Sequence, residues 1–165
     1  MGSNTQMNRL LRISLFIIII ILIQSMLFSV FNIFGAKIDL ILIFVVLWAA
    51  LRGPEEGLII GFVFGLFQDF LSVNYYGNTL AKMILGFLVG VVKTKIYEIQ
   101  YNLSGLFVFI FCFASFILNY FIFTYFLGLK IEFSLFHLIL SAVLNSLISY
   151  LCFPLIAAVV GSKYD

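Results

Sequence analysis

Three long apolar runs constrain the fold of this chain more than any other feature of its sequence. They cover residues 10–34, 103–127 and 135–160, and each exceeds the roughly 20 residues that a helix needs to cross a bilayer. They lack the alternation of apolar and polar residues that is typical of membrane β-barrels. Because 64% of the 165 residues are hydrophobic and only 10% are charged, a soluble fold would lack a polar surface. The sequence therefore predicts an all-α integral membrane protein.

Three shorter apolar runs complete a pattern of six predicted transmembrane helices. They cover 38–51, 58–71 and 79–92, and each alone is short enough to be a re-entrant or core segment instead. The stretches between the runs hold nearly all the turn-forming and charged residues: 52–57, 72–77, 93–102 and 128–133. We therefore expect one six-helix transmembrane domain over 10–160, with short flanking segments at 1–9 and 161–165. Residues 1–6 are compatible with a cloning remnant.

The basic residues predict the orientation of these helices. With six spans, one side of the membrane receives Arg9, Arg12, Arg52, Lys93, Lys95 and Lys163, and the other receives Lys37 and Lys130. Short cytoplasmic loops carry the excess of lysine and arginine. Both termini, and hence segments 1–9 and 161–165, are therefore expected in the cytoplasm.

Two rows of residues spaced by four mark the pair of runs in the middle of the chain. The first row leads through three glycines to a carboxylate: Gly57, Gly61, Gly65 and Asp69. The second row leads through an asparagine and a lysine to two glycines: Asn78, Lys82, Gly86 and Gly90. Residues four apart share one ridge of a helix, and small residues on a ridge let membrane helices approach closely. We therefore expect the two helices to pack as an antiparallel hairpin.

Folding this hairpin about its midpoint places Asp69 opposite Lys82, Gly65 opposite Gly86 and Gly61 opposite Gly90. A buried carboxylate and a buried ammonium are tolerated when they pair with each other. This register predicts an Asp69–Lys82 ion pair. Two alternatives stay open, because both charges could instead reach the membrane interface, and the glycine ridges could face another protein.

Residues that would support catalysis are scarce. His137 is the only histidine, so a histidine-based metal site or proton relay is not expected. Cys112 and Cys152 lie inside apolar runs and are expected to be buried free thiols. Isolated polar residues in the apolar runs, namely Gln24, Asn119 and Asn145, are expected to form hydrogen bonds between helices. These features predict neither an enzyme nor a cofactor, and the net charge of +2 gives no indication of nucleic-acid binding.

Residues 37–90 resemble the MreD family of rod shape-determining proteins. In that family an aspartate opens the second helix, here Asp39, and a glycine-rich helix ends in Gly-Leu-x-x-Asp, here residues 65–69. An outer loop with a glycine follows, here Gly77, and the next helix ends in Gly-x-x-x-Gly, here Gly86 and Gly90. Ile38 stands where the family often has proline.

The resemblance implies a multi-pass protein of the bacterial inner membrane that acts as a non-enzymatic scaffold of the cell-elongation (rod) complex. Such proteins bind the periplasmic scaffold MreC and work with the MreB filament, the RodA glycosyltransferase and a penicillin-binding transpeptidase in peptidoglycan synthesis and cell shape. The family is also similar in fold to the substrate-binding subunits of energy-coupling-factor transporters. A substrate-binding subunit for a vitamin or another small molecule is therefore the alternative, with a pocket at the outer face to which Asn74, Tyr75, Tyr76 and Glu132 could contribute.

Overall fold

The computed structural model describes residues 18–24, 36–71, 77–95, 101–126, 128 and 134–160, and its regular elements are helices. The α-helices are α2 (Leu40–Arg52), α3 (Pro54–Leu71), α4 (Gly77–Lys95), α5 (Tyr101–Phe121) and α6 (Leu135–Val160). A π-helical segment, η1 (Ile122–Phe126), continues α5. Residues 18–24, within the first predicted span, are also helical. The rest of that span, both terminal segments, and the loop positions Tyr75, Tyr76, Lys130 and Glu132 lie outside the described residues.

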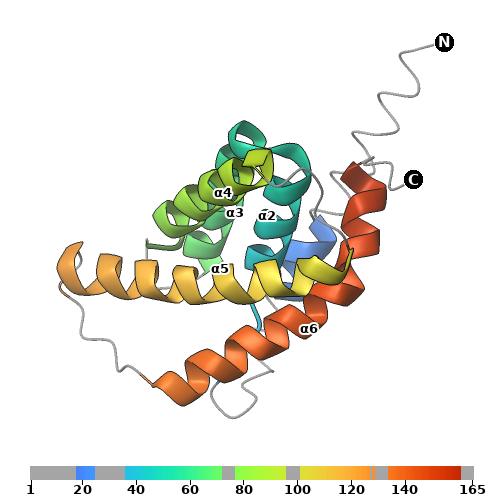
Figure 1. Cartoon of the computed structure of the whole chain (residues 1–165). Coiled ribbons are helices and arrows are strands. Elements are labelled where there is room, and N and C mark those ends of the chain that lie inside the picture. The colour runs from blue at the N-terminus through green and yellow to red at the C-terminus, as the bar shows by residue number, and fades with distance from the viewer. Residues whose placement is uncertain are drawn as a thin grey trace.

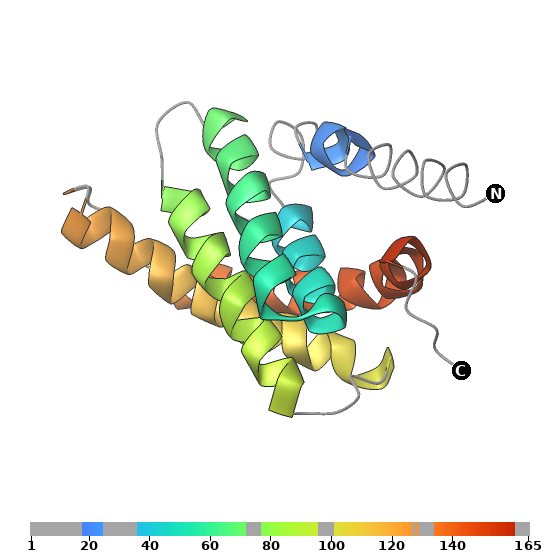
Figure 2. The ribbon, with the colours of Figure 1, turned by 90° about the horizontal axis from the view of Figure 1, so that it is seen from above.

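The helices form two groups, which Figure 1 shows one above the other. Helices α2, α3 and α4 lie together, and α5 and α6 form an antiparallel pair that crosses beneath them. Figure 2 shows the same groups from above, with α3 and α4 side by side. Within the second pair, Gly105 of α5 lies against the ring of Tyr150 of α6, and Ser146 Oγ donates a 2.9 Å hydrogen bond to the Gly105 carbonyl.

Helix α2 is enclosed on all sides. Its residues from Ile41 to Ala50 are all buried, and a helix that is apolar all round is expected to lie in a protein interior. Its 13 residues correspond to about 20 Å, which is shorter than the roughly 30 Å hydrocarbon core of a bilayer. Helix α2 is therefore a short helix enclosed by its neighbours.

The surface and the interior of the molecule have reversed polarity. Large apolar side chains lie on the outside of every helix except α2, among them Phe70 at 79% exposure and Leu151 at 73%. The buried side chains include Lys82, Asp69 and Asn145. Within the part of the chain that the structure describes, two helical stretches could each cross a membrane by length and composition, Ser104–Tyr125 and Leu135–Val160. This distribution is typical of a protein in contact with lipid.

Glycines hold α3 and α4 in backbone contact. A Cβ atom added to Gly57 would overlap the Gly86 carbonyl, and one added to Gly61 would overlap the Lys82 carbonyl. Near the other end of α4, a Cβ atom on Gly90 would overlap Pro54. The glycine ridges therefore face each other within one chain, as expected of small residues in membrane helices.

The predicted register of this hairpin is wrong. The sequence placed Gly86 opposite Gly65, whereas the structure places Gly86 opposite Gly57, which is eight residues or about two helical turns away. Gly65 lies instead against Thr79, in the first turn of α4. The last turns of α3 extend beyond the start of α4, because Asp69 accepts hydrogen bonds from the first amides of α4.

Candidate functional site

Polar side chains from several helices converge on the start of α2. Asp39 is the N-cap of this helix, and its Oδ1 accepts a 2.8 Å hydrogen bond from the backbone N–H of Leu42. The backbone N–H of Asp39 donates to Oδ1 of Asn145 on α6 at 2.9 Å. An aspartate at this position satisfies an amide that the helix itself leaves free. The local sequence thus fixes both the start of α2 and the position of its carboxylate.

Lys82 pairs with this carboxylate. The distance from Lys82 Nζ to Asp39 Oδ2 is 2.8 Å, and the lysine side chain has no exposed area while 21% of the Asp39 side chain is exposed. Gln68 Nε2 lies 3.4 Å from the same Asp39 oxygen. The predicted Asp69–Lys82 ion pair is therefore wrong, and Asp39, which the resemblance singled out only as a helix-opening residue, is the partner.

Asp69 has a different task, because it caps α4 from the neighbouring helix. Its Oδ1 accepts from the backbone N–H and side-chain amide of Asn78, at 3.1 Å and 3.0 Å. Its Oδ2 accepts from the backbone N–H and hydroxyl of Thr79, at 2.9 Å and 2.5 Å. Asp69 is 4% exposed and Lys82 is fully buried, which excludes the alternative that both reach the membrane interface.

The buried charges balance once the helix ends are included. Asp39 and Asp69 each lie at the N-terminus of a helix, where the unpaired amides correspond to about half a positive charge. Lys82 contributes one positive charge directly. Two carboxylates therefore face one ammonium and two helix N-termini, so each carboxylate has positive charge beside it. Such matching is needed because isolated buried charges are costly.

A second set of polar contacts holds the residues that precede α2. Gln24 donates from Nε2 to the Ile38 carbonyl at 3.2 Å and accepts at Oε1 from the Leu40 N–H at 2.8 Å. The Lys37 N–H donates to Ser141 Oγ of α6 at 3.0 Å. The predicted interhelical role of Gln24 and Asn145 is confirmed. Asn119 differs, because its amide donates to Ser115 of its own helix, at 3.4 Å.

This arrangement is suited to holding helices together rather than to chemistry. The polar groups of Asp39, Gln68 and Asn145 bond to other parts of the same chain. Within the described ranges, no group of three or more histidine, cysteine or acidic side chains could hold a metal ion. His137 is exposed on α6, away from this polar cluster.

Comparison with known proteins identifies the family. A family model described as rod shape-determining protein MreD matches residues 4–160. The chain belongs to the MreD family. No curated protein and no solved structure matches it. Membership indicates a role in rod shape determination, in a family of shape-determining proteins rather than enzymes. Together with the two apolar helices of spanning length, it also indicates a membrane protein.

In this MreD-family protein, the residues predicted from the sequence belong to two features, the glycine packing contacts and the polar contacts of Asp39, Lys82 and Asp69. Gly57, Gly61, Gly65, Gly86 and Gly90 form the contact between α3 and α4, and Gly77 lies against the ring of Phe123 at the start of η1. Asp39 and Lys82 form the ion pair, and Asp69 caps α4. The sequence analysis did not single out Gln68, which directly precedes Asp69. In the structure Gln68 is 4% exposed.

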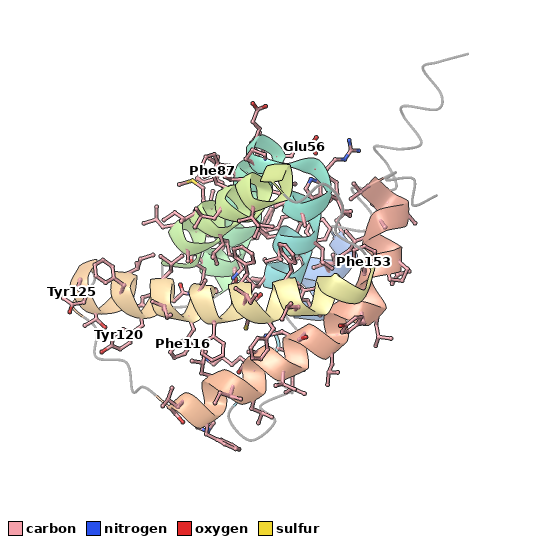
Figure 3. All side chains as sticks on the ribbon, in the orientation of Figure 1. Glu56, Phe87, Phe116, Tyr120, Tyr125 and Phe153 are labelled. Atoms are coloured by element: carbon pink, nitrogen blue, oxygen red, sulfur yellow. The ribbon has the colours of Figure 1, made fainter. Side chains whose placement is uncertain are left out.

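The opposite end of α2 has its own polar contacts, one of them with Glu56, whose side chain is labelled in Figure 3. Arg52 Nη2 donates to the carbonyl of Val160, the last residue of α6, at 2.5 Å. Trp48 Nε1 donates to Glu56 Oε2 at 3.2 Å, and the guanidinium of Arg52 lies 3.9 Å from the same oxygen. A cation at a helix C-terminus is favourable. In this MreD-family fold, α2 is thus bound to α6 at both ends.

Proposed function

We propose that this MreD-family chain is a non-enzymatic scaffold of the cell-elongation complex in the bacterial inner membrane. It binds an MreC-type periplasmic scaffold protein, and through it supports peptidoglycan synthesis with the RodA glycosyltransferase, a penicillin-binding transpeptidase and MreB. One observation supports the scaffold over a ligand-binding role. The buried polar groups around Asp39 bond to one another and fix the helices, so their bonding capacity serves the fold.

The alternative, a substrate-binding transporter subunit, would require polar groups directed at a ligand. Such sites present a few convergent polar side chains in an apolar cavity. In this chain Lys82 is directed at Asp39, and Asp69 accepts four hydrogen bonds from Asn78 and Thr79. The proposed likeness in fold to energy-coupling-factor subunits therefore concerns helix arrangement rather than ligand capture.

Copurification tests the partner. The tagged protein is solubilised in mild detergent together with a coexpressed single-span MreC-type protein, and an unrelated single-span protein serves as the control. We expect the MreC-type protein to copurify and the control to be lost. Binding of a vitamin at submicromolar affinity, without copurification, would instead support the transporter subunit.

Cysteine labelling tests the proposed orientation, with both termini in the cytoplasm. After Cys112 and Cys152 are replaced, single cysteines are introduced at Asn74, Gly128 or Gly53. We expect membrane-impermeant thiol reagents to label the first two positions in intact cells and to label Gly53→Cys only after the cells are opened. Labelling of Gly53→Cys from outside would contradict the orientation.

A further inference from the structure

We propose that the α3–α4 hairpin is a hinged unit, with Gly53 as its hinge and the Asp39–Lys82 ion pair as the latch that holds its far end closed. The hairpin would rotate as one body against α2, α5 and α6. This conformational device is independent of the identity of any partner protein. It follows from the backbone conformation at Gly53 and from the position of the ion pair between the hairpin and the start of α2.

The hinge is the single residue between α2 and α3. Gly53 has φ 107° and ψ −174°, a backbone conformation that only glycine adopts readily. An added Cβ atom would have nothing within 4 Å, so this glycine is not required by close packing. Its amide caps α2 by donating to Ala49, and its carbonyl accepts from Gly57 of α3. The last hydrogen bond of α2 and the first of α3 are therefore both made by Gly53. A rotation about the backbone bonds of Gly53 breaks the hydrogen bonds of neither helix.

The hairpin itself is rigid. Gly57, Gly61 and Gly65 bring α3 into backbone contact with α4, and Asp69 ties the last turn of α3 to the first turn of α4. Near the hinge, Gly90 of α4 packs on Gly53 and Pro54. Both chain connections of the hairpin therefore leave from the hinge end, whereas its other end is held to the rest of the chain by non-covalent contacts, which include the ion pair with Asp39 and the packing of Gly77 on Phe123.

The latch lies at that other end. The ion pair of Lys82 with Asp39, supported by Gln68, joins the hairpin to the start of α2. Asp39 is in turn joined to α6 through Asn145. Between hinge and latch, the contacts of the hairpin with α2 include apolar ones such as the rings of Phe44 and Phe64, whose centroids are 4.9 Å apart.

The surroundings decide which of these contacts holds the hairpin closed. In a bilayer, apolar faces that separate are covered by lipid tails, so no hydrophobic driving force keeps them together. Separating Lys82 from Asp39 instead leaves a charge unpaired in a medium of low dielectric constant. The ion pair therefore contributes more to closure than it would in a soluble protein.

Distances between spin labels test this device. Nitroxides are placed on exposed positions in a background of Cys112→Ser and Cys152→Ser. The outer pair, at Phe70 and Phe136, spans the latch end, and the inner pair, at Ile59 and Leu155, spans the hinge end. The latch is removed in the neutral double variant Asp39→Asn/Lys82→Met. Asn119→Leu is the matched control, because it removes a polar contact within α5 alone.

We expect the outer distance to lengthen in the double variant while the inner distance stays as in the wild type. The 18 residues of α3 form an arm of roughly 27 Å, so a rotation of about 10° moves its tip by about 4–5 Å. Asn119→Leu should change neither pair. If the double variant does not fold, Lys82→Met alone gives the same comparison, because it removes the ion pair while Asp39 keeps the Leu42 amide and Gln68. An unchanged outer distance, or equal changes in both pairs, would overturn the proposal.

Discussion

The Asp39–Lys82 ion pair should make two substitutions strongly non-additive. Lys82 is fully buried and donates to Asp39. Asp39→Asn keeps an acceptor for the Leu42 amide but leaves the ammonium without a counter-charge. Breaking a buried pair in this way costs about 3–5 kcal/mol.

The reverse substitution should cost less. In Lys82→Met, Asp39 retains the Leu42 amide and Gln68, and its side chain is 21% exposed. The loss is then nearer that of one charge-assisted hydrogen bond, about 1.5–3 kcal/mol. In the double variant both charges are absent, so its cost should not exceed that of Asp39→Asn alone. The magnitude of the resulting interaction energy should then be at least the cost of Lys82→Met alone, about 1.5–3 kcal/mol.

The three variants are compared by their free energies of unfolding, measured in mixed micelles of mild detergent and dodecyl sulfate. The matched control is the combination of Asp69→Asn with Lys82→Met, because Asp69 bonds to Asn78 and Thr79 rather than to Lys82. This control pair should be additive within about 0.5 kcal/mol. Additive effects for Asp39 and Lys82, or strong coupling of Asp69 to Lys82, would refute the pairing described here.

Three further predictions concern the other contacts between helices. Asp69→Ala removes the acceptor for the first amides of α4 and should cost about 2 kcal/mol, measured as thermal unfolding of the purified protein; an unchanged midpoint would mean that the cap is dispensable. Gly57→Leu should abolish folded yield, because the leucine side chain would overlap the backbone of α4. Leu58→Phe, at the neighbouring exposed position, should be neutral. Size-exclusion profiles distinguish the two variants, and a monodisperse Gly57→Leu protein would contradict the contact. Arg52→Gln weakens the bond to the end of α6 and should lower the free energy of unfolding by about 1 kcal/mol. Because this contribution is electrostatic, the decrease should be smaller in high salt.

Local spacing was enough to predict which helices meet, but not their register. The glycines at steps of four correctly indicated contact between α3 and α4. Their alignment was inferred from the midpoint of the hairpin, and a shift by whole turns keeps every glycine on the same ridge. The deciding factor was Asp69, which satisfies the amides of α4. Spacing places Asp69 on the same ridge as the glycines, but it does not show which groups of the neighbouring helix the carboxylate contacts.

The partner of Lys82 was unpredictable for a related reason. Both Asp39 and Asp69 belong to neighbouring helices, and sequence distance favours the nearer one. The choice depends on the enclosed position of α2, which brings Asp39 to α4. The pattern of an apolar run of 14 residues does not show which helices will surround it, so the sequence could not place Asp39 beside Lys82.

The enclosed position of α2 bears on how this chain is inserted during synthesis. A helix of about 20 Å cannot cross the hydrocarbon core alone, and its first carboxylate would enter the membrane without a counter-charge. The lysine that pairs with Asp39 is made 43 residues later, and the asparagine that binds its amide is made 106 residues later. We therefore expect the second apolar segment to stay near the membrane surface or beside the insertion machinery at first. We expect it to reach its final place when α6, which carries Asn145, has been made.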